Sequence, residues 1–163
     1  MGFEGLLALL NSSPAVEERQ RFGLNKEKQL SSLQGMGSDV VDRKSSVVEI
    51  AKTLAAEAAD QGRDGMIAVA NTMGNRSKRQ NKSLMDVISA PNQYYGFTAK
   101  NKDKRYGEVK DIADDIANQL VNGTLEDTTD GAEFFLLPDE RTRKWHGDKT
   151  KTIGSHTFYK PSQ

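Results

Sequence analysis

The stretch LAAEAADQGRDGMIAVANTMGNR, residues 54–76, decides the fold class, because it holds parts of two amphipathic helices and the break between them. Ser46 and Glu49 form an S-x-x-E capping box, which predicts a first helix over residues 46–59. Its apolar residues recur at helical spacing: Val47, Ile50, Ala51, Leu54 and Ala58. Gly62 is expected to end this helix and Asp64 to cap a second one, which has its own apolar face: Ile67, Val69, Ala70 and Met73.

Glu57 is the unusual residue of the first predicted helix. It lies seven residues after Ile50 and three after Leu54, and these offsets place it on the apolar stripe. The nearby C-terminal end of the helix disfavours a negative charge by up to about 1 kcal/mol. If the side chain is partly buried, both effects favour a protonated carboxyl, which is what the cleavage of a glycosidic bond requires of its acid. The alternative is a surface glutamate at the margin of a shorter helix.

The rest of the chain after residue 44 predicts further helices and a small sheet. Ser83 and Asp86 favour a short helix over 83–88, and a longer one is expected over 107–121, with Gly123 just beyond its end. The segments AEFFLLP (132–138) and TIGSHTFYK (152–160) indicate two strands that pair, while SAPNQYYGFTAKN (89–101) is typical of irregular or short-strand structure. The predicted fold class is α+β, mostly helical, with a small antiparallel β element.

Composition predicts one domain with an extension. Residues 45–163 form the expected domain, and residues 1–44 an adaptor and linker that ends in the Ser/Gly-rich SSLQGMGSD. The chain has 163 residues, no cysteine and a formal net charge of zero, so global charge does not indicate nucleic acid or a membrane. The segment MGFEGLLALLNSSP lacks a basic region before its apolar run, so we expect no signal peptide, and the run is too short to span a bilayer.

Four motifs in order carry a resemblance to a known family. The stretch around Glu57 resembles A-E-A-x-x-E-x-x-x-G-x-x-A-V-A-x-V-x-x-N-R, and NQYYGFT (92–98) resembles a Q-F-S-type segment. TLEDTTDGAEFF (124–135) resembles D-x-T-x-G-A-x-x-Y/F, and IGSHTFY (153–159) matches I-G-x-H-x-F-Y. Together these motifs resemble the spore cortex-lytic (SleB-type) family of cell-wall hydrolases over about residues 46–160.

The resemblance implies a lysozyme-like fold, similar to that of lytic transglycosylases, and peptidoglycan glycan strands as substrate. It carries the family's catalytic glutamate over to Glu57, without a cofactor. The family's second glutamate is Gln61 here, which puts any role of that second carboxylate in doubt. Hydrolysis usually needs two carboxyl groups, whereas a transglycosylase needs one, so the transglycosylase route is favoured and hydrolysis stays open.

Further residues are candidates for contact with the sugar. Rings and amides of the 93–97 segment suit a groove, although Tyr95 and Phe97 equally suit a core. Thr129 and His156 match family motifs, and His156 could orient Glu57, bind a sugar or close a hydrogen bond in the core. The lone tryptophan lies in RTRKWHGDK (141–149), which is expected to be a polar loop, and either stacks on a sugar or covers the core. The predicted substrate-binding residues are Gln93, Tyr94, Tyr95, Phe97, Thr129, Trp145 and His156.

Two histidines without a carboxylate cluster argue against a zinc peptidase, so no metal site is predicted. Because we expect no secretory route, we also expect a bacteriophage to bring the enzyme to the wall, either released from the host cytoplasm at lysis or carried in the virion. Residues 1–44 then suit docking to virion or tail proteins. The main alternative is an inactive virion or tail protein that keeps the fold. Nucleic-acid binding through the basic stretch from Gly74 to Arg105 is a weaker alternative, because no nucleic-acid motif is present.

Overall fold

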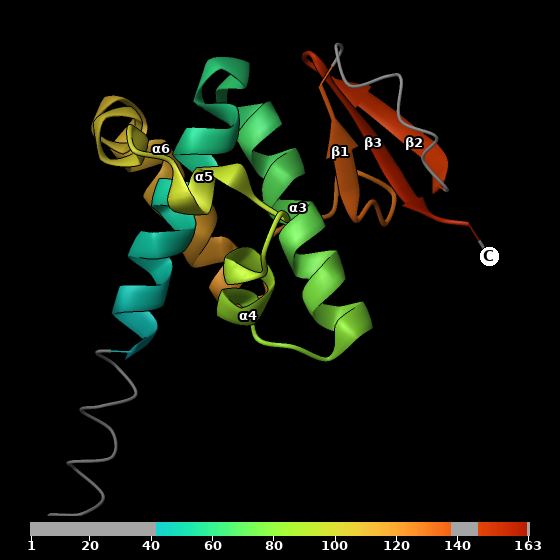
Figure 1. Ribbon diagram of the computed structural model, residues 1–163, viewed down its shortest axis with the longest axis horizontal. Helices are drawn as coiled ribbons and strands as arrows, with labels where there is room; N and C mark the ends of the chain where they lie inside the picture. Colours follow the sequence, from blue (N-terminus) through green and yellow to red (C-terminus); the bar gives the residue numbers. More distant parts are fainter. Residues whose placement is uncertain (1–41, 138–146, 163) are drawn as a thin grey trace, which may run out of the picture. The chain divides into compact units, whose positions relative to one another are not determined.

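The computed structural model describes residues 42–137 and 147–162. Residues 44–163 belong to one compact unit. This unit is mostly helical with a small antiparallel sheet, which confirms the predicted fold class (Figure 1). A helix over residues 42–58 is followed by these elements: η1 (Ala59–Gln61), α3 (Gly62–Gln80), α4 (Leu84–Ser89), α5 (Tyr95–Thr98), α6 (Lys102–Asn122), β1 (Phe134–Leu136), β2 (Gly147–Ile153) and β3 (His156–Pro161).

The break predicted between the first two helices is present, but both predicted caps are wrong. The first helix already runs at residue 42, so Ser46 is inside it, and the Glu49 carboxylate binds Lys102 Nζ at 2.9 Å instead of capping. The α-helix ends at residue 58, and the 3-10 turn η1 leads to Gly62, whose φ of +68° reverses the chain. Such a φ is easily adopted only by glycine. Asp64 lies in the first turn of α3 and does not cap it.

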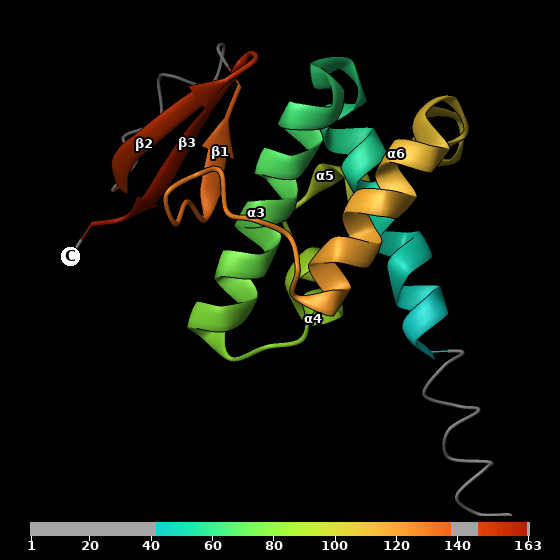
Figure 2. The same cartoon turned by 180° about the vertical axis from the view of Figure 1, so that it is seen from behind.

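Helix α3 lies between the other helices and the sheet, with β1 as the strand nearest to it (Figures 1 and 2). This central position explains why so many residues of α3 are buried, because one side of the helix packs on other helices and the other side packs on β1. The largest fully buried apolar side chains come from the first helix, α3, α4, α6 and β3: Ile50, Leu54, Met66, Val69, Met73, Ile88, Ile116 and Phe158.

The remaining helices follow the prediction except near α5. Ser83 caps α4 by accepting a hydrogen bond from the Asp86 amide at 3.1 Å, as the sequence predicted. Helix α6 ends at Gly123 as expected but begins at Lys102, before a break in helical geometry at Val109. The segment expected to be irregular or a strand contains α5, one turn of helix. Four residues are too few to produce a helical period in the sequence.

The sheet has the strand order β1-β3-β2, and both pairs are antiparallel. Strand β1 pairs with β3 in the register Phe135 to Phe158, which confirms the predicted pairing. The prediction of one strand over 152–160 is wrong, because the chain turns at Gly154 (φ +58°) between β2 and β3. Strand β2 also includes residues 147–149, which were predicted to be loop. Its mainly polar sequence, GDKTKTI, gave no strand signal.

Two predictions lie outside the described residues: the sugar contact of Trp145, and nearly all of the adaptor over residues 1–44. Within the residues that the structure does describe, none of the helices has the length and apolar character needed to cross a membrane.

Candidate active site

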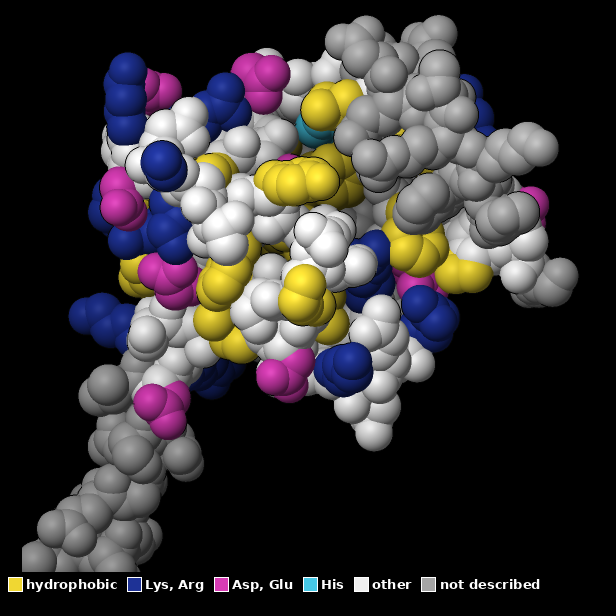
Figure 3. Space-filling model, in the orientation of Figure 1, with side chains coloured by type: hydrophobic (Ala, Val, Ile, Leu, Met, Phe, Trp, Pro, Cys, Tyr) yellow, Lys and Arg dark blue, Asp and Glu magenta, His cyan; other side chains and the backbone are white. Residues whose placement is uncertain are grey.

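A cleft of about 530 Å³ lies between the sheet and the helices. Strand β1 with the residues on either side of it lines one side, and residues 92–95, which end in the first residue of α5, line the other. Figure 3 shows exposed hydrophobic side chains over the middle of this face of the molecule, with charged side chains of both signs toward its edge. The cleft is lined by Glu57, Arg76, Asn92, Gln93, Tyr94, Tyr95, Glu133, Phe134, Phe135, Leu136 and Leu137.

Glu57 lies in this cleft, at the end of the helix over residues 42–58. Its side chain is half-buried, and its Oε1 accepts a hydrogen bond from the Gly96 amide of α5 at 2.5 Å. A Cβ at Gly96 would lie 2.7 Å from the Thr53 carbonyl oxygen and 2.9 Å from Glu57 Cγ. Glycine is therefore required for α5 to approach closely enough to donate this hydrogen bond. The one-turn helix thus orients the carboxyl group.

Three of the predicted sugar-binding residues line the cleft: Gln93 and Tyr94, directly before α5, and Tyr95, its first residue. Gln93 is exposed, and Tyr95 is 67% exposed, so its ring can stack on a sugar. Tyr94 is buried although it lines the cleft, and its hydroxyl lies 3.0 Å from the Thr72 hydroxyl of α3. Burial raises the pKa of Tyr94 above its ordinary value, so the phenol stays protonated near neutral pH.

Three other predicted sugar-binding residues do not line the cleft. Phe97 packs against the hydrophobic core, with Lys102 Nζ 5.2 Å from its ring centroid. His156 is 1% exposed, and its ring lies 5.0 Å from that of Phe135. Thr129 is fully buried. None of the three side chains lines the cleft, and their contact with a sugar stays a prediction.

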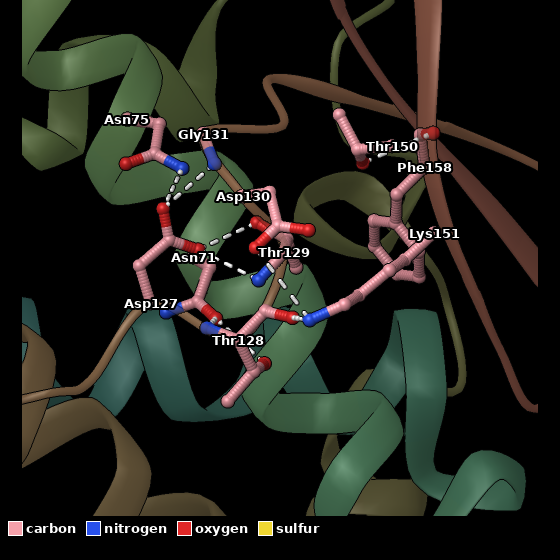
Figure 4. Close-up of polar contacts among 10 residues, drawn as sticks. All are labelled: Asn71, Asn75, Asp127, Thr128, Thr129, Asp130, Gly131, Thr150, Lys151 and Phe158. Atoms are coloured by element: carbon pink, nitrogen blue, oxygen red, sulfur yellow. Dashed lines mark hydrogen bonds and ion pairs between the residues drawn. The ribbon is translucent and has the colours of Figure 1, made fainter.

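The loop that contains Thr129 is held by a network around Asp127 (Figure 4). The Asp127 carboxylate accepts hydrogen bonds from the Thr129 amide and hydroxyl at 2.8 and 2.7 Å, and from the Gly131 amide at 2.9 Å. Burial acts to raise the pKa of Asp127, but these bonds and one from Asn75 outweigh it, so the pKa lies below its ordinary value. On α3, Asn71 binds the same loop through the Thr128 amide at 2.9 Å.

This network positions the start of β1, and with it one wall of the cleft. Asn75 also donates to the Ala132 carbonyl at 3.0 Å, directly before Glu133 and β1. Asparagines at an i, i+4 spacing lie on one face of a helix, so Asn71 and Asn75 fasten the loop to α3 at two points. The family motif around Asp127 thus has a structural meaning here: it places β1 opposite Glu57.

Sequence reasoning missed several residues that line the cleft, above all Arg76 and Glu133. Both are buried, at 6% exposure each, and the Glu133 carboxylate forms an ion pair with Arg79. Arg76 matched a family motif but was given no role. Glu133 had no signal in the sequence, because a single carboxylate before an apolar strand is typical of a surface position.

Comparison with known proteins identifies the family. A family described as Cell Wall Hydrolase matches residues 60–159, a range that begins three residues after Glu57. The chain belongs to the cell wall hydrolase family. It is accordingly an enzyme that cleaves the bacterial cell wall.

Two solved structures share the fold of this cell wall hydrolase. One is the catalytic domain of the germination-specific lytic transglycosylase SleB from Bacillus anthracis, with 26% identity and a TM-score of 0.57 over 71% of this chain and 93% of that one. The other is the catalytic domain of the Bacillus cereus SleB protein, with 24% identity and a TM-score of 0.57 over 72% and 91% of the two chains. No curated protein matches the chain.

Gln61, which stands in place of the family's second glutamate, has a structural role in this cell wall hydrolase. Its Oε1 accepts a hydrogen bond from the Ser155 amide at 2.8 Å, and its Nε2 donates to Asp60 at 3.0 Å. Gln61 does not line the cleft. It ties the turn between β2 and β3 to η1, and a glutamine oxygen accepts this hydrogen bond as a carboxylate oxygen does.

The basic stretch from Gly74 to Arg105 is not a continuous positive face. Three of its cations are engaged within the protein, in contacts between Arg79 and Glu133, Lys102 and Glu49, and Arg105 and the Ala56 carbonyl. In the part of the chain that the structure describes, no cluster of three or more His, Cys, Asp or Glu side chains is arranged to hold a metal ion.

Proposed function

We propose that this chain is a peptidoglycan lytic transglycosylase that cleaves between N-acetylmuramic acid and N-acetylglucosamine, with Glu57 as general acid and base. The observation that carries the proposal is the oriented carboxyl group of Glu57 in the cleft, with its Oε1 bound to the Gly96 amide at 2.5 Å. The similarity to the SleB lytic transglycosylase domain of Bacillus anthracis supports the same reaction.

The geometry suggests how Glu57 acts. Because Oε1 accepts the Gly96 N–H, the acidic proton is best carried by Oε2. Glu57 donates that proton to the glycosidic oxygen as the bond from this oxygen to C1 of muramic acid breaks. The 6-hydroxyl of the same muramic acid attacks C1, and its proton returns to Glu57. The products are a 1,6-anhydro sugar and a free 4-hydroxyl, so no water is consumed and no second carboxylate is required.

Aromatic and amide side chains in the cleft suit a glycan. We propose that Tyr95 stacks on a sugar ring, since it is 67% exposed and lines the cleft. Gln93 is exposed beside it and offers both a donor and an acceptor to sugar hydroxyls. The apolar side chains of β1 face them and exclude water from part of the site.

A second candidate is a muramidase that uses water. It is favoured by Glu133, the other carboxylate that lines the cleft, which could activate a water molecule while Glu57 protonates the leaving oxygen. The ion pair of Glu133 with Arg79 occupies one of the carboxylate oxygens that would have to activate the water. We rank transglycosylation first for this reason.

The alternative of an inactive structural protein loses its main argument. That argument was the replacement of the family's second glutamate by Gln61, but Gln61 lies outside the cleft and binds the Ser155 amide. The side chain at position 61 therefore attaches the β2–β3 turn, and a glutamine there does not argue for lost catalysis.

The deciding experiment is a digest of purified peptidoglycan by the wild type, Glu57→Gln and Glu108→Gln, with fragments identified by mass spectrometry. Glu108 is exposed on α6 and does not line the cleft, so it is the matched control for the loss of one carboxylate. We expect anhydro-muropeptides from the wild type and the control, and none from Glu57→Gln. Reducing-end fragments would identify a hydrolase instead, and Glu133 would be tested next. No fragments from a folded wild type would support the structural protein.

We also propose that the enzyme serves bacteriophage entry or lysis, with residues 1–44 docking onto a virion or tail protein. The support is the adaptor-like sequence of that segment, which ends in a Ser/Gly-rich linker. A truncated chain lacking residues 1–44 should keep its activity on peptidoglycan but lose its association with phage particles. Unchanged association after truncation would contradict the docking role.

A further inference from the structure

Arg76 is a buried cation in the wall of the cleft that the reaction above does not use. It projects from α3 and is 6% exposed, yet it lines the same cleft as Glu57. The guanidinium carbon lies 4.4 Å from the ring centroid of Phe134 and 5.5 Å from that of Tyr94. Two aromatic rings therefore hold the planar group in one orientation, as cation–π contacts favour.

The hydrogen bonding of this guanidinium is incomplete. Its Nε is buried and has no hydrogen-bond partner among the residues that the structure describes. Burial lowers the pKa of Arg76, and the nearby Tyr94 hydroxyl and Glu133 carboxylate only partly offset this, but an arginine stays protonated in proteins. A buried charged donor without a full set of acceptors costs free energy, which a ligand acceptor in the cleft would recover.

The neighbouring Glu133 carboxylate does not supply the missing acceptor for Arg76. Glu133 forms its ion pair with Arg79, which lies three residues further along α3 and is half exposed. Two rings cover the faces of the Arg76 guanidinium, so an acceptor for its remaining donors is best supplied from the cleft that Arg76 lines. A planar fork of donors is best matched by a carboxyl or amide oxygen.

The glycan offers one such group that differs between its two sugars. Both sugars carry an N-acetyl group, but only muramic acid carries a lactyl ether on C3, with a carboxyl-derived oxygen at its end. We propose that Arg76 is a specificity-determining residue that binds the carboxyl-derived oxygen of this lactyl group and so selects muramic acid over glucosamine in its subsite. This inference rests on the proposed function, since it assumes that the glycan occupies the cleft.

The test is calorimetric binding to the full chain carrying Glu57→Gln, so that the glycan stays intact. The probes are a peptide-free tetrasaccharide of alternating N-acetylglucosamine and N-acetylmuramic acid, and chitotetraose, which lacks only the lactyl groups. Adding Arg76→Gln should weaken binding of the muramic tetrasaccharide about 10- to 100-fold, as expected for a lost hydrogen bond to a charged group. Binding of chitotetraose should change less than about twofold by the same reasoning.

Arg79→Gln is the matched control, because it removes the same charge from the same helix, beside the same carboxylate, but outside the cleft. It should leave the preference for the muramic tetrasaccharide intact. An equal loss for both glycans in Arg76→Gln would overturn the proposal, because Arg76 would then bind the N-acetyl group or only shape the cleft. An equal effect of Arg79→Gln would also overturn it, because Arg76 would then act through Glu133.

Arg76→Lys keeps the charge and the apolar stem but not the planar fork, so it covers the case in which the glutamine variant fails to fold. It should still lose preference for the muramic tetrasaccharide, and full retention would overturn the proposal. Failure of the proposed function would appear elsewhere: Glu57→Gln would cleave the tetrasaccharide during the titration, or the wild type would cleave no peptidoglycan.

Discussion

Replacing Gly96 by alanine adds one methyl group where α5 touches the helix that carries Glu57. The new Cβ would lie 2.7 Å from the Thr53 carbonyl oxygen, 2.9 Å from Glu57 Cγ and 3.0 Å from Ala56 Cβ. These distances are about 0.5–0.8 Å shorter than the contact of ~3.5 Å at which such atoms attract. Two of the three neighbours are fixed by the helix backbone, so α5 has to move away.

The distance that α5 moves in Gly96→Ala determines how far kcat falls. A shift of this size breaks or bends the 2.5 Å hydrogen bond from the Gly96 amide, and Glu57 loses the contact that orients its carboxyl group. A misplacement of about 1 Å can cost ~100-fold in rate, so kcat should fall between about 10- and 100-fold. Overpacking should also reduce the free energy of unfolding by about 1–3 kcal/mol. Tyr95 belongs to α5 and moves with it, so KM should rise as well, by no more than the about fivefold expected for losing the Tyr95 ring.

The assay is the initial rate of fragment release from peptidoglycan over a range of substrate concentrations, alongside thermal unfolding. Gly107→Ala is the matched control: Gly107 lies in α6, and a Cβ there meets nothing within 4 Å. The control should keep full activity and gain about 0.5–1 kcal/mol in stability, since alanine favours a helix. Wild-type kcat in a folded Gly96→Ala variant would refute the reasoning that this amide positions Glu57.

Further outcomes follow from other contacts. Asp127→Asn should lower the free energy of unfolding at neutral pH by about 1–3 kcal/mol, measured by urea denaturation; an unchanged midpoint would contradict the network. Because the pKa of Asp127 is lowered by folding, its contribution is present above the unfolded pKa of about 3.9 and is lost as pH falls through the folded value, so wild type and variant should converge in acid. Gln61→Glu should keep activity within about twofold, while Gln61→Ala should cost about 0.5–1.5 kcal/mol of stability, and a large gain of activity in the glutamate variant would show that a carboxylate is needed there. Tyr95→Ala should raise KM about fivefold without a change in melting temperature, because the ring is exposed and a stacking contact contributes about 1 kcal/mol; an unchanged KM would remove Tyr95 from the sugar site.

The parts of the fold that could be predicted are those with a local signal. Ser83 and Gly123 mark helix ends through caps, and both are where they were expected. The aromatic runs of β1 and β3 indicated a strand pair, which the register of Phe135 with Phe158 confirms. The start of the first helix was wrong because Glu49, which completes the apparent capping box, is used in an ion pair with Lys102. That contact depends on residues 53 positions apart, so no local pattern contains it.

In the candidate site too, features with a local sequence signal could be predicted and contacts between distant residues could not. The position of Glu57 on the apolar face of its helix and its match to a family motif are properties of the sequence, because helical spacing decides which residues share a face. The sequence also determined the polar loop residues around Asp127, since side chains that bond to the backbone two residues on are coded locally. Only the tertiary structure decided that Gly96 would contact Glu57, that Gln61 would hold Ser155, and that Arg76 would line the cleft. These contacts join segments separated by tens of residues, and packing of α3 between the helices and β1 brings them together. The local sequence determines the conformational preference of each residue, but contacts between residues far apart in the chain depend on how the core packs.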